Sequence, residues 1–131
     1  MKGGETDIVK LSLEYSIQVV DVYRLLEKDN AGKILGKQFL RSGTSIGANV
    51  HEAQGAQSKA DFIAKMSIAH KEARETAYWI QLFKEALLIS PDIINTIAKE
   101  TTKIIKILSS ILLTSKRNHQ QKPKCSNTLK S

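Results

Sequence analysis

The stretch "LRSGTSIGANVHEA" (residues 40–53) decides whether the middle of the chain is a loop or a helix. It holds Gly43, Thr44, Ser45 and Gly47 within five positions, a composition typical of loops. Apolar residues nevertheless continue through it at helical spacing: Leu35, Phe39, Ile46, Val50 and Ala53. We therefore predict a helix from about residue 33 to residue 54, with these glycines inside it.

Three other segments show the same helical period, and sustained strand-like alternation is absent from the sequence. The first runs from Ile8 to Leu26 after Asp7, which suits an N-cap. The third follows Ser58, a second capping candidate, and repeats apolar residues three or four positions apart from Phe62 to Leu87. Each segment is long enough for an amphipathic helix of a bundle.

Turn and start signals separate these segments. Asn30 and Gly32 are predicted to end the first helix as left-handed residues. Ser90 and Pro91 predict the start of the fourth helix, since an N-cap followed by proline suits the first turn. The apolar residues of this helix run from Ile94 to Ile111.

Four amphipathic helices with short connections predict an all-α, antiparallel up-down-up-down four-helix bundle in residues 1–115. Three of the helices carry a second apolar stripe beside the first, so we expect part of the outer surface to be buried against another subunit. The second stripes are Leu13, Ile17 and Val20, then Ile68, Tyr78 and Leu82, then Ile93, Ile107 and Leu112. No apolar run approaches a membrane span, and the N-terminus lacks an apolar signal core, so we expect a cytoplasmic protein.

The net charge of +7 is concentrated at the C-terminus. Residues 116–131 contain five basic residues and no acid, which leaves a net charge of only +2 for residues 1–115. We predict a disordered basic tail that attracts phosphate groups, although a short basic end can also serve only to keep a protein in solution. Its candidate nucleic-acid contacts are Lys116, Arg117, Lys122, Lys124 and Lys130.

The sequence does not carry the usual enzymatic sites of a helical bundle. A di-iron site needs Glu three residues before each ligating His, and none of His51, His70 and His119 has one. Gly43, Ser45 and Gly47 match the G-x-S-x-G pattern, but that elbow follows a strand, whereas here the helical period continues. We expect no catalytic residue, cofactor or metal.

The helix through residues 40–53 has two flanks with different roles. On a helical wheel Gly36, Gly43 and Gly47 share one flank, where we expect a close-packed neighbour. The other flank is a polar ridge that contains Arg41, Ser45, Asn49 and Glu52. If the second and third helices are antiparallel around residues 55–58, Arg41 lies opposite Glu72, with Glu75 one turn away. We expect these polar residues to set helix register or subunit pairing.

Two quoted motifs together resemble a known family. They are "FLRSGTSIGANVHEA" and "DFIAKMSIAHKEARETAYWIQLF", and the match covers roughly residues 8–113. The residues that carry it are Arg41, Ser45, Ile46, Asn49, Glu52, Phe62, Lys71, Glu72, Glu75, Thr76, Tyr78 and Trp79. The chain resembles the small bacterial four-helix-bundle proteins encoded in intervening sequences of 23S rRNA genes. The resemblance implies a barrel-shaped homopentamer and no enzymatic activity.

Two hypotheses of function follow. Distant relatives by fold, the accessory variability proteins of diversity-generating retroelements, bind a reverse transcriptase and nucleic acid. The first hypothesis is therefore a non-enzymatic homopentamer that binds RNA, DNA or a nucleic-acid enzyme such as a reverse transcriptase through its basic surface and tail. The second is a structural or protein-interaction module whose basic tail only solubilises it.

Overall fold

The computed structural model describes residues 7–130, and side chains up to residue 120. Four helices make up the fold: α1 (Ile8–Leu26), α2 (Asn30–Ala53), α3 (Lys59–Glu85) and α4 (Pro91–Lys130). No strand occurs between residues 7 and 130. The stretch at residues 40–53 is helical throughout, and Gly43 and Gly47 lie inside α2.

Capping side chains determine where the first three helices begin. An Asp7 carboxylate oxygen accepts the N–H groups of Val9 and Lys10, and the Ser58 hydroxyl accepts the N–H of Asp61. The boundary expected at Asn30 and Gly32 is wrong. Asp29 caps α2 by accepting the N–H of Gly32, so both residues belong to the first turn of α2 and neither is left-handed. An aspartate acceptor at this position favours a helix start over a helix end.

The turn between α3 and α4 ends the heptad pattern of α3 at Phe83, earlier than the sequence indicates. Leu87 has a positive φ of 58° and is 83% exposed. The N–H of Leu88 bonds the carbonyl of Phe83, and the N–H of Leu87 bonds that of Lys84. These two bonds define a Schellman motif, which stops the helix and turns the chain toward Pro91.

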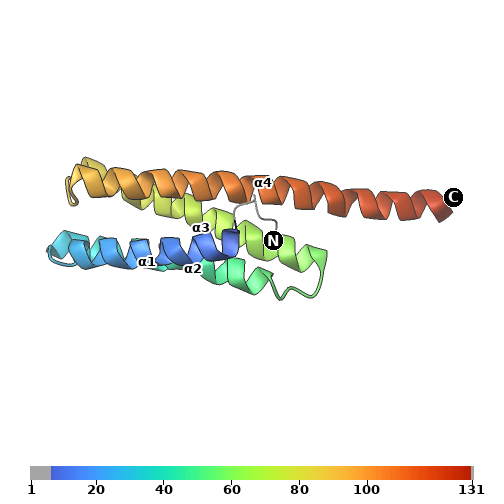
Figure 1. Ribbon diagram of the computed structural model, residues 1–131, viewed down its shortest axis with the longest axis horizontal. Helices are drawn as coiled ribbons and strands as arrows, with labels where there is room; N and C mark the ends of the chain where they lie inside the picture. Colours follow the sequence, from blue (N-terminus) through green and yellow to red (C-terminus); the bar gives the residue numbers. More distant parts are fainter. Residues whose placement is uncertain (1–6, 131) are drawn as a thin grey trace.

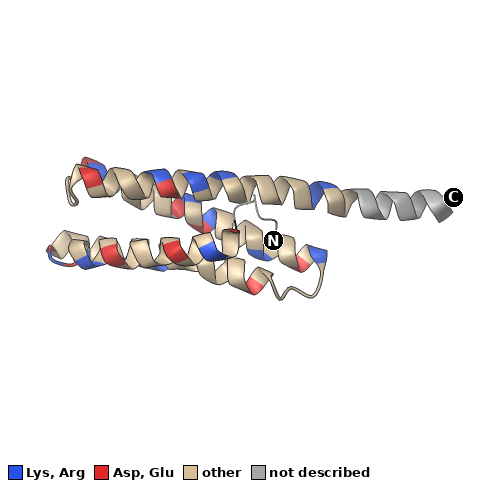
Figure 2. Ribbon diagram, in the orientation of Figure 1, with Lys and Arg blue, Asp and Glu red and all other residues tan. Residues whose placement is uncertain are grey.

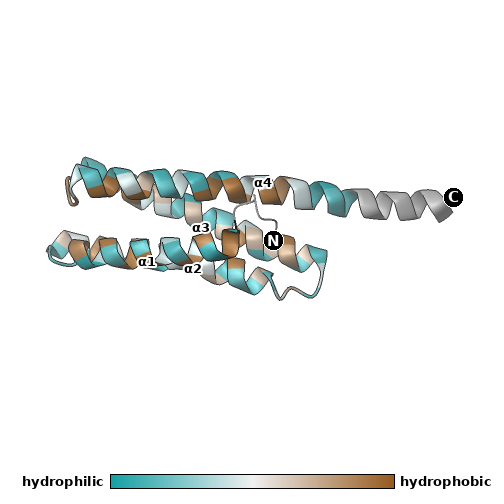
Figure 3. Cartoon of the chain, in the orientation of Figure 1, coloured by the Kyte–Doolittle hydropathy of each residue, from teal (hydrophilic) through white to brown (hydrophobic). Residues whose placement is uncertain are grey.

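Each helix packs against the next one along the chain, and α1 also touches α4 to close the bundle. Large side chains fill the centre; Tyr15, Phe39, Phe83 and Leu108 are all almost completely buried. The rings of Phe39 and Phe83 meet edge to face at 5.6 Å between centroids. In Figure 3 the hydrophobic residues of α4 lie along the edge that faces the other helices.

Figure 1 shows that the direction of the chain reverses from each helix to the next. It also shows α4 extending past the other three helices at its C-terminal end. In the structure α4 continues as a helix to Lys130, whereas the sequence predicts disorder from residue 116. The polar composition of this segment had suggested disorder, but it contains good helix formers such as lysine and glutamine.

Candidate functional site

An ionic network joins α2 to α3. The Arg41 Nη2 atom lies 2.7 Å from Oε2 of Glu75 and 3.2 Å from Oε1 of Glu72. Its Nη1 atom donates a longer hydrogen bond of 3.4 Å to Oε2 of Glu72. Arg41 therefore reaches α3 at Glu72, the residue that the expected register sets opposite it. Its side chain is still 49% exposed.

The two glutamates of this network have different environments. Glu72 is only 9% exposed, and its Oε1 atom is close to Arg41 but accepts no hydrogen bond. Glu75 is more exposed and accepts the indole N–H of Trp79 at 3.0 Å. That hydrogen bond, together with the one from Arg41, lowers the pKa of Glu75. The hydrogen bonds to Glu75 and then to Glu72 raise the pKa of Arg41. Glu75 and Arg41 therefore hold an ion pair at neutral pH.

Two buried hydrogen bonds between helices complete the polar contacts of the core. The Thr76 hydroxyl donates to Oγ of Ser42 at 2.8 Å, which links α3 to α2. Tyr15 of α1 bonds to Thr101 of α4, and burial raises the pKa of the Tyr15 phenol. No polar role was predicted for these four residues from the sequence. Their signal was a small or hydroxylated residue within an apolar stripe, which is common in helix cores.

The side chains of the polar ridge on α2 differ in the helix to which they bond. The hydroxyl of Ser45 donates to the carbonyl of Arg41, and the amide of Asn49 donates to that of Ser45, so both bonds stay within α2. Ser45 and Asn49 therefore bond to carbonyls of their own helix, because the helix backbone supplies the nearest acceptors. Glu52 does reach α3, with its Oε1 atom 3.9 Å from Nζ of Lys65. A subunit-interface role for these residues stays a prediction.

The three glycines on the other flank of α2 lie against α1. A Cβ atom on Gly36 would stand 3.0 Å from the ring of Tyr23, and one on Gly47 would stand 3.1 Å from Oγ of Ser16. At Gly43 it would stand 2.8 Å from both γ-carbons of Val19, closer than real contacts allow. The neighbour that these glycines approach is thus α1 of the same chain.

The outer face of α4 carries a row of cations that we call the α4 basic row: Lys99, Lys103, Lys106 and Arg117. All four are exposed, and none forms an ion pair within the described part of the chain. Blue bands mark several of these positions along α4 in Figure 2. Only Arg117 was among the predicted contacts. The lysine spacing of four and three was visible in the sequence but was obscured by the nearly neutral charge of residues 1–115 as a whole.

The predicted contacts at the C-terminus divide into two groups. Lys116 and Arg117 are described and exposed, whereas the side chains of Lys122, Lys124 and Lys130 lie outside the described part of the structure. Next to Lys116, the seam between α3 and α4 contains a hydrogen bond of 2.9 Å between Nε2 of His70 and Oγ of Ser109. Burial lowers the pKa of His70, and the charges of Arg74 and Lys116 lower it further. Cations of both helices therefore gather at this seam.

The described residues do not form a metal-binding cluster. Within residues 7–120, no three His, Cys, Asp or Glu side chains come together as a metal cluster would require. The Ser45 hydroxyl bonds its own helix backbone, as a packed helical serine does. No described helix combines the length and the apolar character that crossing a bilayer demands.

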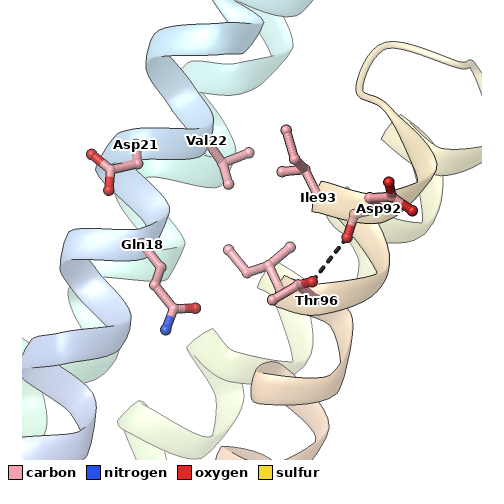
Figure 4. Close-up of a pocket in the computed structure, with 7 residues that line it drawn as sticks. Gln18, Asp21, Val22, Asp92, Ile93 and Thr96 are labelled. Atoms are coloured by element: carbon pink, nitrogen blue, oxygen red, sulfur yellow. Dashed lines mark hydrogen bonds between the residues drawn. The ribbon is translucent and has the colours of Figure 1, made fainter.

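A groove with a volume of about 320 Å³ opens between α1 and α4. Val22, Ile93 and Ile97 supply its apolar surface. Gln18 and Asp21 stand on the α1 side and Asp92 and Thr96 on the α4 side, where the Thr96 hydroxyl bonds the carbonyl of Asp92 (Figure 4). The groove lies toward the start of α4.

Comparisons with known proteins agree with this architecture. The sequence model described as 23S rRNA-intervening sequence protein matches residues 4–110. The chain is also similar to the crystal structure of a protein with unknown function from the S23 ribosomal protein family of Bacteroides thetaiotaomicron. The two sequences are 43% identical, the TM-score is 0.78, and the match covers 81% of this chain and 98% of the other. Among curated proteins, none matches the chain.

Proposed function

Because the chain belongs to the family of 23S rRNA-intervening sequence proteins, we propose that it is a non-enzymatic, homo-oligomeric bundle that binds nucleic acid. The observation that carries this proposal is the α4 basic row. It is a binding function without catalysis, and it uses the outer face of α4 together with the basic C-terminal segment.

The geometry of the row suits a phosphate backbone. From Lys99 to Arg117 a helix rises by about 27 Å, at roughly 1.5 Å per residue, so the cations form a line rather than a point. The only acid in that segment is Glu100, which is half-buried and close enough to Tyr15 of α1 to affect its pKa. An uncompensated line of cations attracts a polyanion and releases its counterions.

Assembly would multiply this attraction. We propose that antiparallel, up-down-up-down bundles stand side by side in a homopentamer, as the family resemblance implies. Leu13 and Ile17 on the outer face of α1 support a subunit contact, because they are 53% and 56% exposed in the single chain. Five basic segments in one particle would make individually weak phosphate contacts effective through multivalency.

The proposal is tested by measuring RNA and DNA binding across a salt series. The test variant replaces Lys99, Lys103 and Lys106 with glutamine, and the matched control replaces the exposed Lys33, Lys37 and Lys84, which removes the same charge from other faces. For single strands the slope of log affinity against log salt should become shallower by about 0.7 for each phosphate that the protein no longer neutralises. We expect this change in the α4 variant and little change in the control.

Removal of residues 116–131 separates the three lysines of the row from the end of the chain, which includes Arg117. Weaker binding in the truncated protein would assign phosphate contacts to this segment, whereas unchanged binding would restrict the contacts to Lys99, Lys103 and Lys106. If the full chain binds no RNA or DNA even at low salt, the structural or protein-interaction role is the better description.

A further inference from the structure

Tyr78 is an exposed aromatic residue on the outer face of α3. Tyr78 is 59% exposed. The ring meets Trp79 edge to face, with 4.9 Å between the centroids and 71° between the planes. The exposed ring therefore rests against a second aromatic group that helps to fix its orientation.

A chain of contacts ties this aromatic pair to the core of the α2–α3 contact. The indole N–H of Trp79 donates to Oε2 of Glu75 at 3.0 Å, and the same oxygen lies 2.7 Å from Nη2 of Arg41. Trp79 is half-buried, so the indole cannot move freely. The ionic network that joins α2 to α3 therefore also holds Trp79, against which the exposed ring of Tyr78 packs.

Two cations share the face of α3 that bears Tyr78. Arg74 and Lys71 precede Tyr78 by four and seven residues, which places all three side chains on one face of the helix. Both are exposed, and neither forms an ion pair within the described part of the chain. This face therefore presents an aromatic ring followed by positive charges.

The positive charge continues from this face to α4. Arg74 and Lys116 of α4 both lie near enough to His70 for their charges to lower the pKa of its imidazole. Because α3 and α4 run in opposite directions (Figure 1), the bond between His70 and Ser109 puts Arg74 close to the level of Lys106. A strand bound along the α4 basic row would reach Tyr78 by crossing Arg74.

We propose that Tyr78 is a stacking platform for an unpaired base of single-stranded nucleic acid, with Lys71 and Arg74 contacting the adjacent phosphates. This inference rests on the proposed function and specifies the form of nucleic acid that it uses. A duplex keeps its bases stacked on one another, so a ring on an outward helix face has no free base to meet. A single strand offers such faces whatever its sequence, and cations beside an aromatic ring are the usual arrangement for binding it.

The experiment uses the full chain with an unstructured 20-nucleotide RNA, the corresponding DNA strand, and a duplex of the same length as probes. Binding is measured with Tyr78→Ala and with Tyr78→Phe, which keeps a ring that can stack. Ile34→Ala is the matched control, because Ile34 is 68% exposed on α2 and carries no ring. Trp79 is the only tryptophan of the chain, so its fluorescence reports on the site during the same titrations.

We expect Tyr78→Ala to weaken single-strand binding roughly ten-fold, and Tyr78→Phe and Ile34→Ala to leave it nearly unchanged. Single strands should also quench Trp79 more than the duplex does. Equal binding by Tyr78→Ala, with binding still dependent on the α4 basic row, would overturn the platform and leave the proposed function intact. A lower particle mass in Tyr78→Ala would overturn it too, since Tyr78 would then be a subunit contact. Absence of binding by the unmodified chain would end both proposals.

Discussion

At the scale of single residues, Arg41 is the most informative side chain of the α2–α3 contact. Glu72 is 9% exposed, and Arg41 is its only ion-pair partner in the described structure. We expect Arg41→Ala to lower the free energy of unfolding by about 1 to 2 kcal/mol, because it leaves a buried carboxylate without its partner. Chemical denaturation followed by circular dichroism measures this decrease.

Two further variants separate the buried partner from surface charge. Arg24→Ala removes an exposed arginine whose pair with Asp21 is 3.9 Å long, and it should be nearly neutral. Adding Glu72→Gln to Arg41→Ala should restore part of the stability, because the neutral amide is cheaper to bury. Unchanged unfolding of Arg41→Ala in every respect would mean that the bridge does not contribute to the fold.

The residue scale also shows what a sequence can reveal of such a site. The position of Arg41 opposite Glu72 follows from helix length and turn position, which are regular quantities. The bond between Ser42 and Thr76 and the internal bonds of Ser45 and Asn49 depend on side-chain rotamers and on which acceptor is nearer. Hydrophobic periodicity does not encode those choices, so the acceptors of Ser45 and Asn49 could not be predicted from the sequence.

At the scale of helices, the glycines of α2 determine how closely α1 approaches. Alanine normally stabilises a helix relative to glycine by about 1 kcal/mol. At Gly43 the added methyl would lie 2.8 Å from both γ-carbons of Val19, a β-branched residue that has little rotamer freedom. We expect Gly43→Ala to lower stability by about 1 kcal/mol net, because overpacking outweighs the helix propensity.

Gly55→Ala is the control, since its nearest neighbour would be the Glu52 carbonyl at 3.9 Å. It should melt at or above the temperature of the unmodified protein, and a similar increase for Gly43→Ala would show that α1 can move away freely.

The helices themselves follow from local signals, namely apolar period and caps. Their ends are harder to predict when two signals compete, as Asp29 competes with Asn30 and Gly32, or when the sequence of a segment, such as residues 116–131, has no apolar period.

At the scale of the whole molecule, the proposed pentamer and the basic surface make one joint prediction. The unmodified protein should have a solution mass of about five times its chain mass of 14.6 kDa. Ile17→Glu places a charge in the exposed apolar stripe of α1 and should lower that mass while the helical content is retained. Ile34→Glu is the control on the outer face of α2, where the side chain is 68% exposed.

Assembly and nucleic-acid binding can then be compared in the same variant. If the basic segments act together, the smaller particle formed by Ile17→Glu should bind RNA much more weakly although every cation is still present, because the effective concentration of cations falls. Each chain should keep its own salt dependence, since its phosphate contacts are unchanged. A single-chain mass for the unmodified protein would remove both the ring and the avidity, and binding would then depend on the α4 basic row of one bundle.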